Sequence, residues 1–153
     1  MKKKIFGVLI CVFSLLFLTG CGNKTAITTD TFTKICEENG FESTNVLEQY
    51  SEYEQIKEAT VARNADGLQI EFYVIDSESN AKSMYENNKT KFEEKKGSVS
   101  SNTDVNMGNY QSYSQKSDGR YMSVVRVGNT VIYIDVEDTY KDLMKDLVEK
   151  LGY

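Results

Sequence analysis

The spacing of hydrophobic residues predicts a first helix that begins near residue 31. Phe32, Ile35 and Cys36 fall at positions i, i+3 and i+4, which lie on one face of a helix. Thr29 or Asp30 precedes this run and supplies a side-chain oxygen suited to an N-cap. The Cys36 thiol therefore belongs to the predicted apolar face, where free cysteines are commonly buried.

The next clear pattern is a β-hairpin. Residues 59–64 and 68–75 flank the turn sequence Ala65-Asp66-Gly67, which is typical of a tight connection between antiparallel strands. Within the second strand, apolar residues alternate with more polar ones and so predict a half-buried strand: Leu68, Ile70, Phe72 and Val74. Residues 41–57 contain several apolar residues without a clean period, and no element is predicted there.

The second half of the chain predicts another helix, three strands and a last helix. The helix follows a cap at Asp76 or Ser77, and five residues repeat at helical spacing along it: Ala81, Met84, Tyr85, Asn88 and Phe92. Residues 98–108 have the composition of a loop. Strands are predicted over 109–116, 120–127 and 130–136, with turns at Ser117-Asp118-Gly119 and Gly128-Asn129. The last helix has the apolar stripe Tyr140, Leu143, Met144, Leu147 and Leu151.

The predicted order of elements is therefore α-β-β-α-β-β-β-α. Strands joined as hairpins and separated from the helices indicate an α+β domain. We expect an antiparallel sheet of about five strands with the helices packed on one face.

The first residues do not fit this domain. The chain begins with three lysines and continues from Ile5 to Leu18 without a charge, which is too short a run for a comfortable membrane span. A cationic start, a short apolar middle and small residues at the end are typical of a secretory signal. The run ends with the sequence Leu18-Thr19-Gly20-Cys21.

This ending resembles the lipobox of bacterial prolipoproteins of the Gram-positive type. The resemblance covers residues 1–21. It implies that the Cys21 thiol receives a diacylglyceryl group and that cleavage before Cys21 makes it the N-terminus of the mature protein. We expect a signal peptide over 1–20, a lipidated tether over 21–30 and a single domain over 31–153. An uncleaved anchor or an ordinary secretory signal is the alternative for this leader.

Charge and composition argue against several classes of function. Removing residues 1–20 takes away three lysines and no acid, so the formal net charge falls from −5 to −8. An acidic surface disfavours binding to nucleic acid or to anionic lipid by charge, so we expect membrane attachment through the lipid on Cys21. The chain has no histidine, which excludes catalysis by a Ser-His-Asp or Cys-His arrangement.

Two short motifs are better explained by helix formation. Ser79 and Lys82 have the Ser-x-x-Lys spacing of penicillin-recognising enzymes, but the accompanying motifs are missing and both residues fall in the first turns of a helix. The acidic run from Asp76 lacks the glycine and the final glutamate of a calcium loop. We therefore expect no catalytic residue, no metal site and no cofactor.

Tyrosines on the predicted strands are the remaining candidates for a site. Four of them are proposed as a binding platform for a protein, peptide or glycan partner: Tyr110, Tyr113, Tyr121 and Tyr133. Tyr73 lies on another predicted strand. The alternative is that these tyrosines fill half-buried strand positions, which their β-propensity favours.

The sequence thus indicates a lipoprotein at the cell membrane, facing the extracytoplasmic side, whose small domain binds or scaffolds a partner without catalysis. The alternative is a carboxylate-based hydrolase of the cell envelope, which needs two acids facing each other about 5 to 9.5 Å apart.

Overall fold

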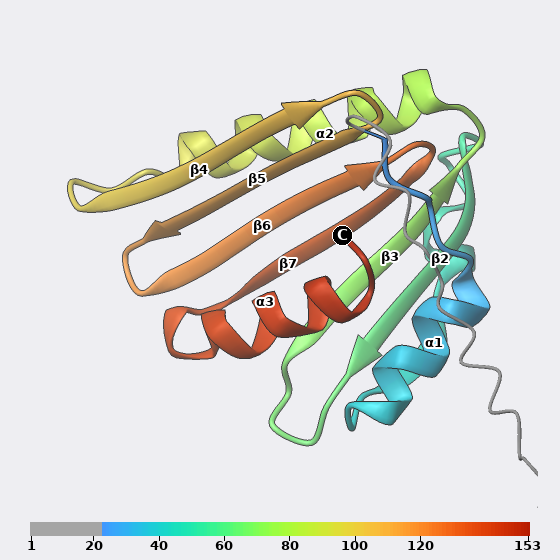
Figure 1. Ribbon diagram of the computed structural model, residues 1–153, viewed down its shortest axis with the longest axis horizontal. Coiled ribbons are helices and arrows are strands. Elements are labelled where there is room, and N and C mark those ends of the chain that lie inside the picture. The colour runs from blue at the N-terminus through green and yellow to red at the C-terminus, as the bar shows by residue number, and fades with distance from the viewer. Residues whose placement is uncertain (1–22) are drawn as a thin grey trace, which may run out of the picture.

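The structure, a computed structural model, describes residues 23–153 (Figure 1). Three α-helices, two short 3-10 helices and seven strands follow one another in this part of the chain. Their bounds are α1 Thr29–Glu38, β1 Glu42–Asn45, η1 Leu47–Tyr50, β2 Ile56–Arg63, β3 Gln69–Ile75, α2 Glu78–Glu94, β4 Ser100–Met107, β5 Tyr110–Ser117, β6 Arg120–Val127, β7 Thr130–Glu137, η2 Asp138–Tyr140 and α3 Lys141–Lys150. None of these helices is long and apolar enough to cross a membrane.

All seven strands form one antiparallel sheet in the order β1-β2-β3-β7-β6-β5-β4. Strands β4 to β7 are a run of hairpins, and β7 pairs with β3 to join this run to β1, β2 and β3. The β5–β6 turn at Asp118-Gly119 has φ of 49° and 75°, the left-handed backbone that an Asp-Gly hairpin turn requires.

The helices cover both faces of the sheet, which the prediction of helices on one face did not anticipate. Helices α1 and α3 lie on one face, and α2 lies on the other (Figure 1). Neighbouring residues of β6 show the reason, because Val124 and Val125 point to opposite faces and are both buried. A strand that is apolar on both sides has to be covered on both sides.

The predicted fold is also wrong in the number of strands and in the order of elements. The sheet has seven strands rather than about five, because β1 and β4 were not recognised. Strand β4 is almost wholly exposed on both faces and forms the edge of the sheet, so its residues are polar and resemble a loop in composition. Strand β1 is only four residues long and also lies at an edge.

The helix ends follow ordinary capping chemistry. The Ser77 hydroxyl accepts a hydrogen bond from the Asn80 backbone N–H at 3.2 Å and caps α2, which confirms one of the two predicted caps. Helix α1 begins earlier than predicted, and its cap is Thr28 instead of Thr29 or Asp30. At its other end, α2 stops at Glu94, just before the basic residues Lys95 and Lys96.

The segment before α1 is fastened to the sheet. The Asn109 side chain accepts a hydrogen bond from the Lys24 backbone N–H at 2.9 Å and donates one to the Lys24 carbonyl at 2.8 Å. Ala26 and Ile27 pack against the core of the face that carries α1 and α3. Ordered structure thus begins before residue 31, and Lys24 to Asp30 belong to the domain rather than to a free tether.

Candidate functional site

The four tyrosines of the predicted platform lie on two opposite faces of the sheet. Tyr110 and Tyr121 are on the face that carries α1 and α3, whereas Tyr113 and Tyr133 are on the face that carries α2. Tyr113 and Tyr121 are buried, and Tyr110 and Tyr133 are half-buried. The structure therefore does not bring the four rings together on one exposed surface.

Their contacts are those of packing residues. The Tyr113 hydroxyl donates a hydrogen bond to the Gln115 side chain at 2.8 Å, and the Tyr133 ring lies 5.3 Å from the Phe92 ring of α2. The Lys24 ammonium lies 4.2 Å from the centre of the Tyr110 ring. Burial, with the Asp135 charge as a smaller cause, raises the pKa of Tyr133 to about 12, so its hydroxyl stays neutral.

The two cysteines outside the apolar leader have different positions. Cys21, the predicted lipidation site, lies outside the described residues. Cys36 is fully buried on α1, as its place in the apolar pattern predicted. Burial and the neighbouring Glu37 carboxylate raise the pKa of its thiol to about 12.

A different set of tyrosines lines a groove on the face that carries α2. This groove encloses about 580 Å³ between the segment 50–56, strand β3 and helix α2. We call it the tyrosine–amide groove, and it is lined by Tyr50, Tyr53, Gln55, Ile56, Tyr73, Ile75, Asn80, Ser83, Met84, Asn87, Asn88 and Lys91. Tyr50 and Tyr53 lie within residues 41–57, where the absence of a clean hydrophobic period predicted no element and no site.

The wall formed by segment 50–56 is held in place by its own backbone. The Tyr53 N–H donates to the Tyr50 carbonyl at 2.8 Å, and the Ile56 N–H donates to the Tyr53 carbonyl at 2.9 Å. The Asp76 N–H, just before α2, donates to the Gln55 carbonyl at 2.9 Å. These bonds fix the segment against the start of α2, so the groove is formed before a ligand arrives.

The tyrosines at the base of the groove form a chain of hydrogen bonds. The Tyr73 hydroxyl donates to the Glu71 carboxylate. Because Tyr73 has a single hydroxyl proton, the Tyr50 hydroxyl must be the donor in its 2.8 Å contact with the Tyr73 oxygen. The two rings meet edge to face, with centres 5.4 Å apart. Burial and the Glu71 charge raise the pKa of Tyr73, which keeps this chain protonated.

The opposite wall is one face of α2. Asn80, Met84, Asn87 and Lys91 recur at three- and four-residue intervals and so project from the same side of the helix. This side of the helix is rich in asparagine and serine, whereas a helix face buried in a core would be apolar. The wall therefore offers amide groups, a thioether and one ammonium to the groove.

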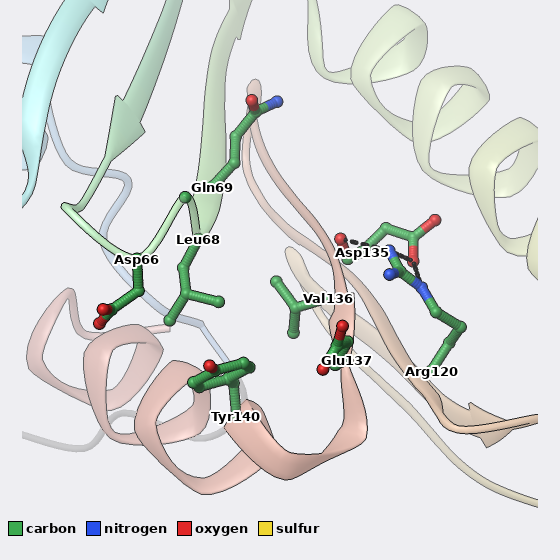
Figure 2. A pocket seen from close by; sticks show the side chains of 9 residues that line it. Asp66, Leu68, Gln69, Arg120, Asp135, Val136, Glu137 and Tyr140 are labelled. Carbon is green, nitrogen blue, oxygen red and sulfur yellow. Dashed lines mark hydrogen bonds and ion pairs between the residues drawn. The ribbon is translucent and has the colours of Figure 1, made fainter.

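A second hollow contains carboxylates. It encloses about 380 Å³ at one end of β3 and β7, which pair only from Glu71 to Val74 and from Thr130 to Tyr133 and no longer pair beyond that point. We call it the acidic pocket, and it is lined by Asp66, Gly67, Leu68, Gln69, Arg120, Asp135, Val136, Glu137 and Tyr140. Figure 2 shows Asp66 on one side of it and the Arg120–Asp135 pair on the other.

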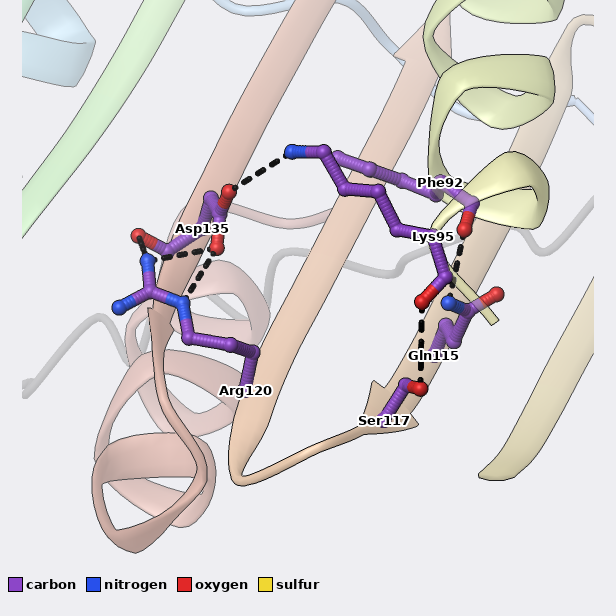
Figure 3. A network of polar contacts seen from close by, with 6 residues as sticks. All are labelled: Phe92, Lys95, Gln115, Ser117, Arg120 and Asp135. Atoms are coloured by element: carbon purple, nitrogen blue, oxygen red, sulfur yellow. Dashed lines mark hydrogen bonds and ion pairs between the residues drawn. The ribbon is translucent and has the colours of Figure 1, made fainter. Parts of the chain in front are cut away.

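The Asp135 carboxylate is paired with two cationic side chains. Arg120 donates to one of its oxygens from Nε at 2.9 Å and from Nη2 at 2.6 Å, and the Lys95 ammonium lies 3.4 Å from the other oxygen (Figure 3). Lys95 caps the C-terminus of α2. The Asp135 carboxylate thus connects the β6–β7 hairpin to this end of the helix.

The same end of α2 is bound to β5 by neutral side chains. The Gln115 amide donates to the Phe92 carbonyl at 2.8 Å, and the Ser117 hydroxyl donates to the Lys95 carbonyl at 3.3 Å (Figure 3). These bonds satisfy carbonyls that the end of a helix leaves without partners. The polar network around Asp135 therefore fastens the helix to the sheet. Residues 23–153 contain no group of three or more acidic or cysteine side chains arranged to hold a metal ion.

Comparison with known proteins does not assign a family. No model of a protein family matches the chain, and no curated protein matches it. A solved structure that resembles this one is the crystal structure of a GTP-binding regulator from Thermotoga maritima, with 16% sequence identity over 82% of this chain and 88% of that chain. Its TM-score is 0.46, which is too low to support an argument about fold or function.

Proposed function

We propose that this protein is a membrane-anchored lipoprotein on the extracytoplasmic side, whose domain binds a partner in the tyrosine–amide groove and catalyses no reaction. The lipobox-like sequence that ends at Cys21 supports the anchor. Two acyl chains on one residue are sufficient for stable membrane attachment, whereas a single chain is marginal. The acidic balance of the mature chain leaves the lipid as the source of membrane affinity.

The observation that supports binding most directly is the chemistry of the groove. It combines tyrosine rings, the apolar side chains Ile56, Ile75 and Met84, and side-chain amides, which is the mixture typical of sites that recognise a ligand by shape and a few polar contacts. Its lining includes no carboxylate. The groove therefore lacks the pair of carboxylates that a carboxylate-based glycoside hydrolase requires.

The alternative function, a carboxylate-based hydrolase, would have to use the carboxylates of the acidic pocket. Asp135 is held between Arg120 and Lys95, and its position is explained by its role in fastening α2. Glu137 and Asp66 are exposed, and Asp66 lies in a hairpin turn. We therefore favour the binding function over the hydrolase.

The anchor is tested by replacing Cys21 with serine in the full chain. We expect mass spectrometry of the wild-type membrane fraction to find a diacylglyceryl adduct on Cys21, and the Cys21→Ser variant to lose the adduct and the membrane association. Circular dichroism should be the same for both proteins, since Cys21 precedes the packed domain. An unmodified Cys21 in the mature wild-type protein would disprove lipid anchoring.

The groove is tested with a photoreactive amino acid incorporated in cells. Position 53 lies in the groove, and position 143 lies on the exposed side of α3 across the sheet. We expect an adduct with an envelope component from position 53 and none from position 143. Equal labelling at both positions would indicate nonspecific contact and would contradict a binding role for the groove.

A further inference from the structure

We infer that the ligand of the tyrosine–amide groove is a neutral, N-acetylated oligosaccharide. This inference rests on the proposed binding function and adds the chemical class of the ligand. Four features of the groove support it: the exposed ring of Tyr53, the side-chain amides on two facing walls, the charge of the groove and its apolar side chains.

The aromatic wall suits the apolar face of a sugar ring. Tyr53 is 52% exposed although it lines a groove, so its ring is available for stacking. The Tyr50 ring stands beside it on the same segment and is fixed edge to face against Tyr73. A pyranose presents C–H groups on one face, and a flat ring with a polar tip can cover them while its hydroxyl stays in water.

Side-chain amides face the ligand from both walls. Gln55 comes from the tyrosine segment and Asn87 from α2, and both side chains are exposed, so their amides are accessible to a ligand. The Asn80 and Asn88 amide nitrogens already donate within the protein, to the Asp76 carboxylate at 2.8 Å and to the Met84 carbonyl at 2.9 Å. Their oxygens remain as acceptors. An amide offers a donor and an acceptor side by side, which matches hydroxyl pairs and the acetamido group of a sugar.

The charge of the groove indicates a ligand without strong charge. Lys91 is its only ionisable residue apart from the tyrosines, and no carboxylate lines it. A cationic ligand would find no carboxylate in the lining, because the Glu71 carboxylate behind Tyr73 already accepts the Tyr73 hydroxyl, and a polyanion would have a single ammonium. The apolar side chains Ile56, Ile75 and Met84 give the groove a surface for a methyl group, which an N-acetyl substituent supplies.

An extended peptide is less well matched to this groove. Peptides that bind along a sheet pair with a free strand edge, and β3 at the base of the groove is paired on one side with β2 and on the other with β7. Several backbone groups of segment 50–56 are already bonded within the protein, among them the Tyr53 and Ile56 N–H groups and the Gln55 carbonyl. The groove therefore offers a ligand mainly polar side chains, and the amides among them suit hydroxyl and acetamido substituents.

The test measures binding of chitotetraose, a neutral tetramer of N-acetylglucosamine, to the mature chain with Cys21→Ser. We expect saturable binding by isothermal titration calorimetry, and at least tenfold weaker binding of cellotetraose, which lacks the acetamido groups. Tyr53→Ala and Asn87→Leu should each weaken chitotetraose binding at least tenfold. Tyr53→Phe should keep most of it because the ring remains, and Leu143→Ala, on the other face, should leave it unchanged.

The other outcomes overturn the inference in distinguishable ways. If neither oligosaccharide binds while position 53 still forms an adduct in cells, the saccharide is refuted and the binding function of the groove stands. A peptide identified in that adduct has the same meaning. Equal affinity for both tetramers refutes recognition of the N-acetyl group, and binding that is unaffected by Tyr53→Ala and Asn87→Leu refutes the groove as the site. Absence of both saccharide binding and the adduct refutes the proposed function as well.

Discussion

Tyr121 and Tyr53 show how differently one residue type is used in this protein. Tyr121 is 6% exposed in the core beneath α3, whereas Tyr53 is 52% exposed in the groove. We expect Tyr121→Ala to lower the free energy of unfolding by about 3 to 5 kcal/mol, the usual cost of emptying a large core site. Tyr53→Ala should change it by no more than about 0.5 kcal/mol. Urea unfolding of both variants measures the difference, and a similar small loss at both positions would contradict the burial of Tyr121.

The Cys36 thiol gives a second prediction at this scale. It is fully buried, and burial together with Glu37 raises its pKa to about 12, so at neutral pH it is protonated and shielded from solvent. We expect a thiol reagent to label Cys36 in the Cys21→Ser protein only after denaturant is added. Mass spectrometry after timed labelling measures this, and rapid modification of the native protein would show that the thiol is accessible.

At the scale of elements, Asn109 joins the segment before α1 to the β4–β5 turn. Its side chain makes two hydrogen bonds to the backbone of Lys24, at 2.8 and 2.9 Å. We expect Asn109→Ala to release this segment and to cost about 1 to 2 kcal/mol of stability, from two hydrogen bonds of ordinary net strength. Released backbone is readily cleaved, so limited trypsin digestion should cut after Lys24 faster in the variant.

The matched control for this prediction is Asn106→Ala. Asn106 lies on β4 three residues earlier, and its side chain is exposed. Its replacement should leave both the stability and the rate of cleavage after Lys24 unchanged. Equal cleavage in the Asn109→Ala variant and the wild type would show that Asn109 does not hold the segment.

At the scale of the whole molecule, the same attachment sets how close the domain lies to the membrane. Lys24 is three residues from Cys21, and three residues span at most about 11 Å. If Cys21 is acylated, the end of the sheet that carries the β4–β5 turn must therefore lie at the bilayer surface. A fluorophore at Met107→Cys should then be quenched by a nitroxide-labelled lipid in vesicles more strongly than one at Ser101→Cys.

These two labelling positions form a matched pair. Both are exposed on β4, and the strand separates them by about 20 Å. The buried Cys36 should not compete for the label. Equal quenching at the two positions would indicate that the domain does not rest on the membrane by this end.

Alkaline pH tests the packing of the whole domain. Burial raises the pKa of Cys36 and of Tyr133 to about 12, above their ordinary values of 9.0 and 10.0, and raises the pKa of Tyr121 and Tyr153 as well. Below about pH 8 these groups are protonated in both the folded and the unfolded chain, so their contribution to stability is constant. As the pH rises from about 9 to 12, the unfolded chain loses protons that the folded chain keeps, and stability falls.

Urea unfolding between pH 7 and pH 10.5 measures this effect. We expect the midpoint concentration of urea to be nearly constant up to about pH 8.5 and to decrease steadily above it. A midpoint that stays constant to pH 10.5 would show that these hydroxyl and thiol groups are not buried as described.

Local patterns were sufficient to predict much of the secondary structure. The helical repeat of Ala81, Tyr85 and Phe92 and the Ser77 cap predicted α2, and the turns at Gly67 and Gly119 marked two hairpins. These features depend on nearest neighbours along the chain, so they can be read without knowing the fold. Strand β4 was missed because an edge strand exposed on both faces has no hydrophobic period to detect.

The candidate site could not be predicted in the same way. The tyrosine–amide groove is built from segment 50–56, strand β3 and one face of α2, which are separate in the sequence and meet only in the folded protein. Tyr53 is part of the groove because Asp76 binds the carbonyl of Gln55 and brings its segment against α2. No periodicity in residues 41–57 indicates this contact.

The sequence by itself determined the three α-helices, the hairpins β2–β3, β5–β6 and β6–β7, the buried position of Cys36 and the leader that predicts lipidation at Cys21, since each depends on neighbouring residues or on a short motif. Only the tertiary structure decided that α2 covers the face opposite α1 and α3, and therefore which tyrosines are buried. Strand geometry places successive side chains on opposite faces, but whether a face is covered depends on where a distant helix packs. Tyr121 is in the core and Tyr53 is in a groove for that reason.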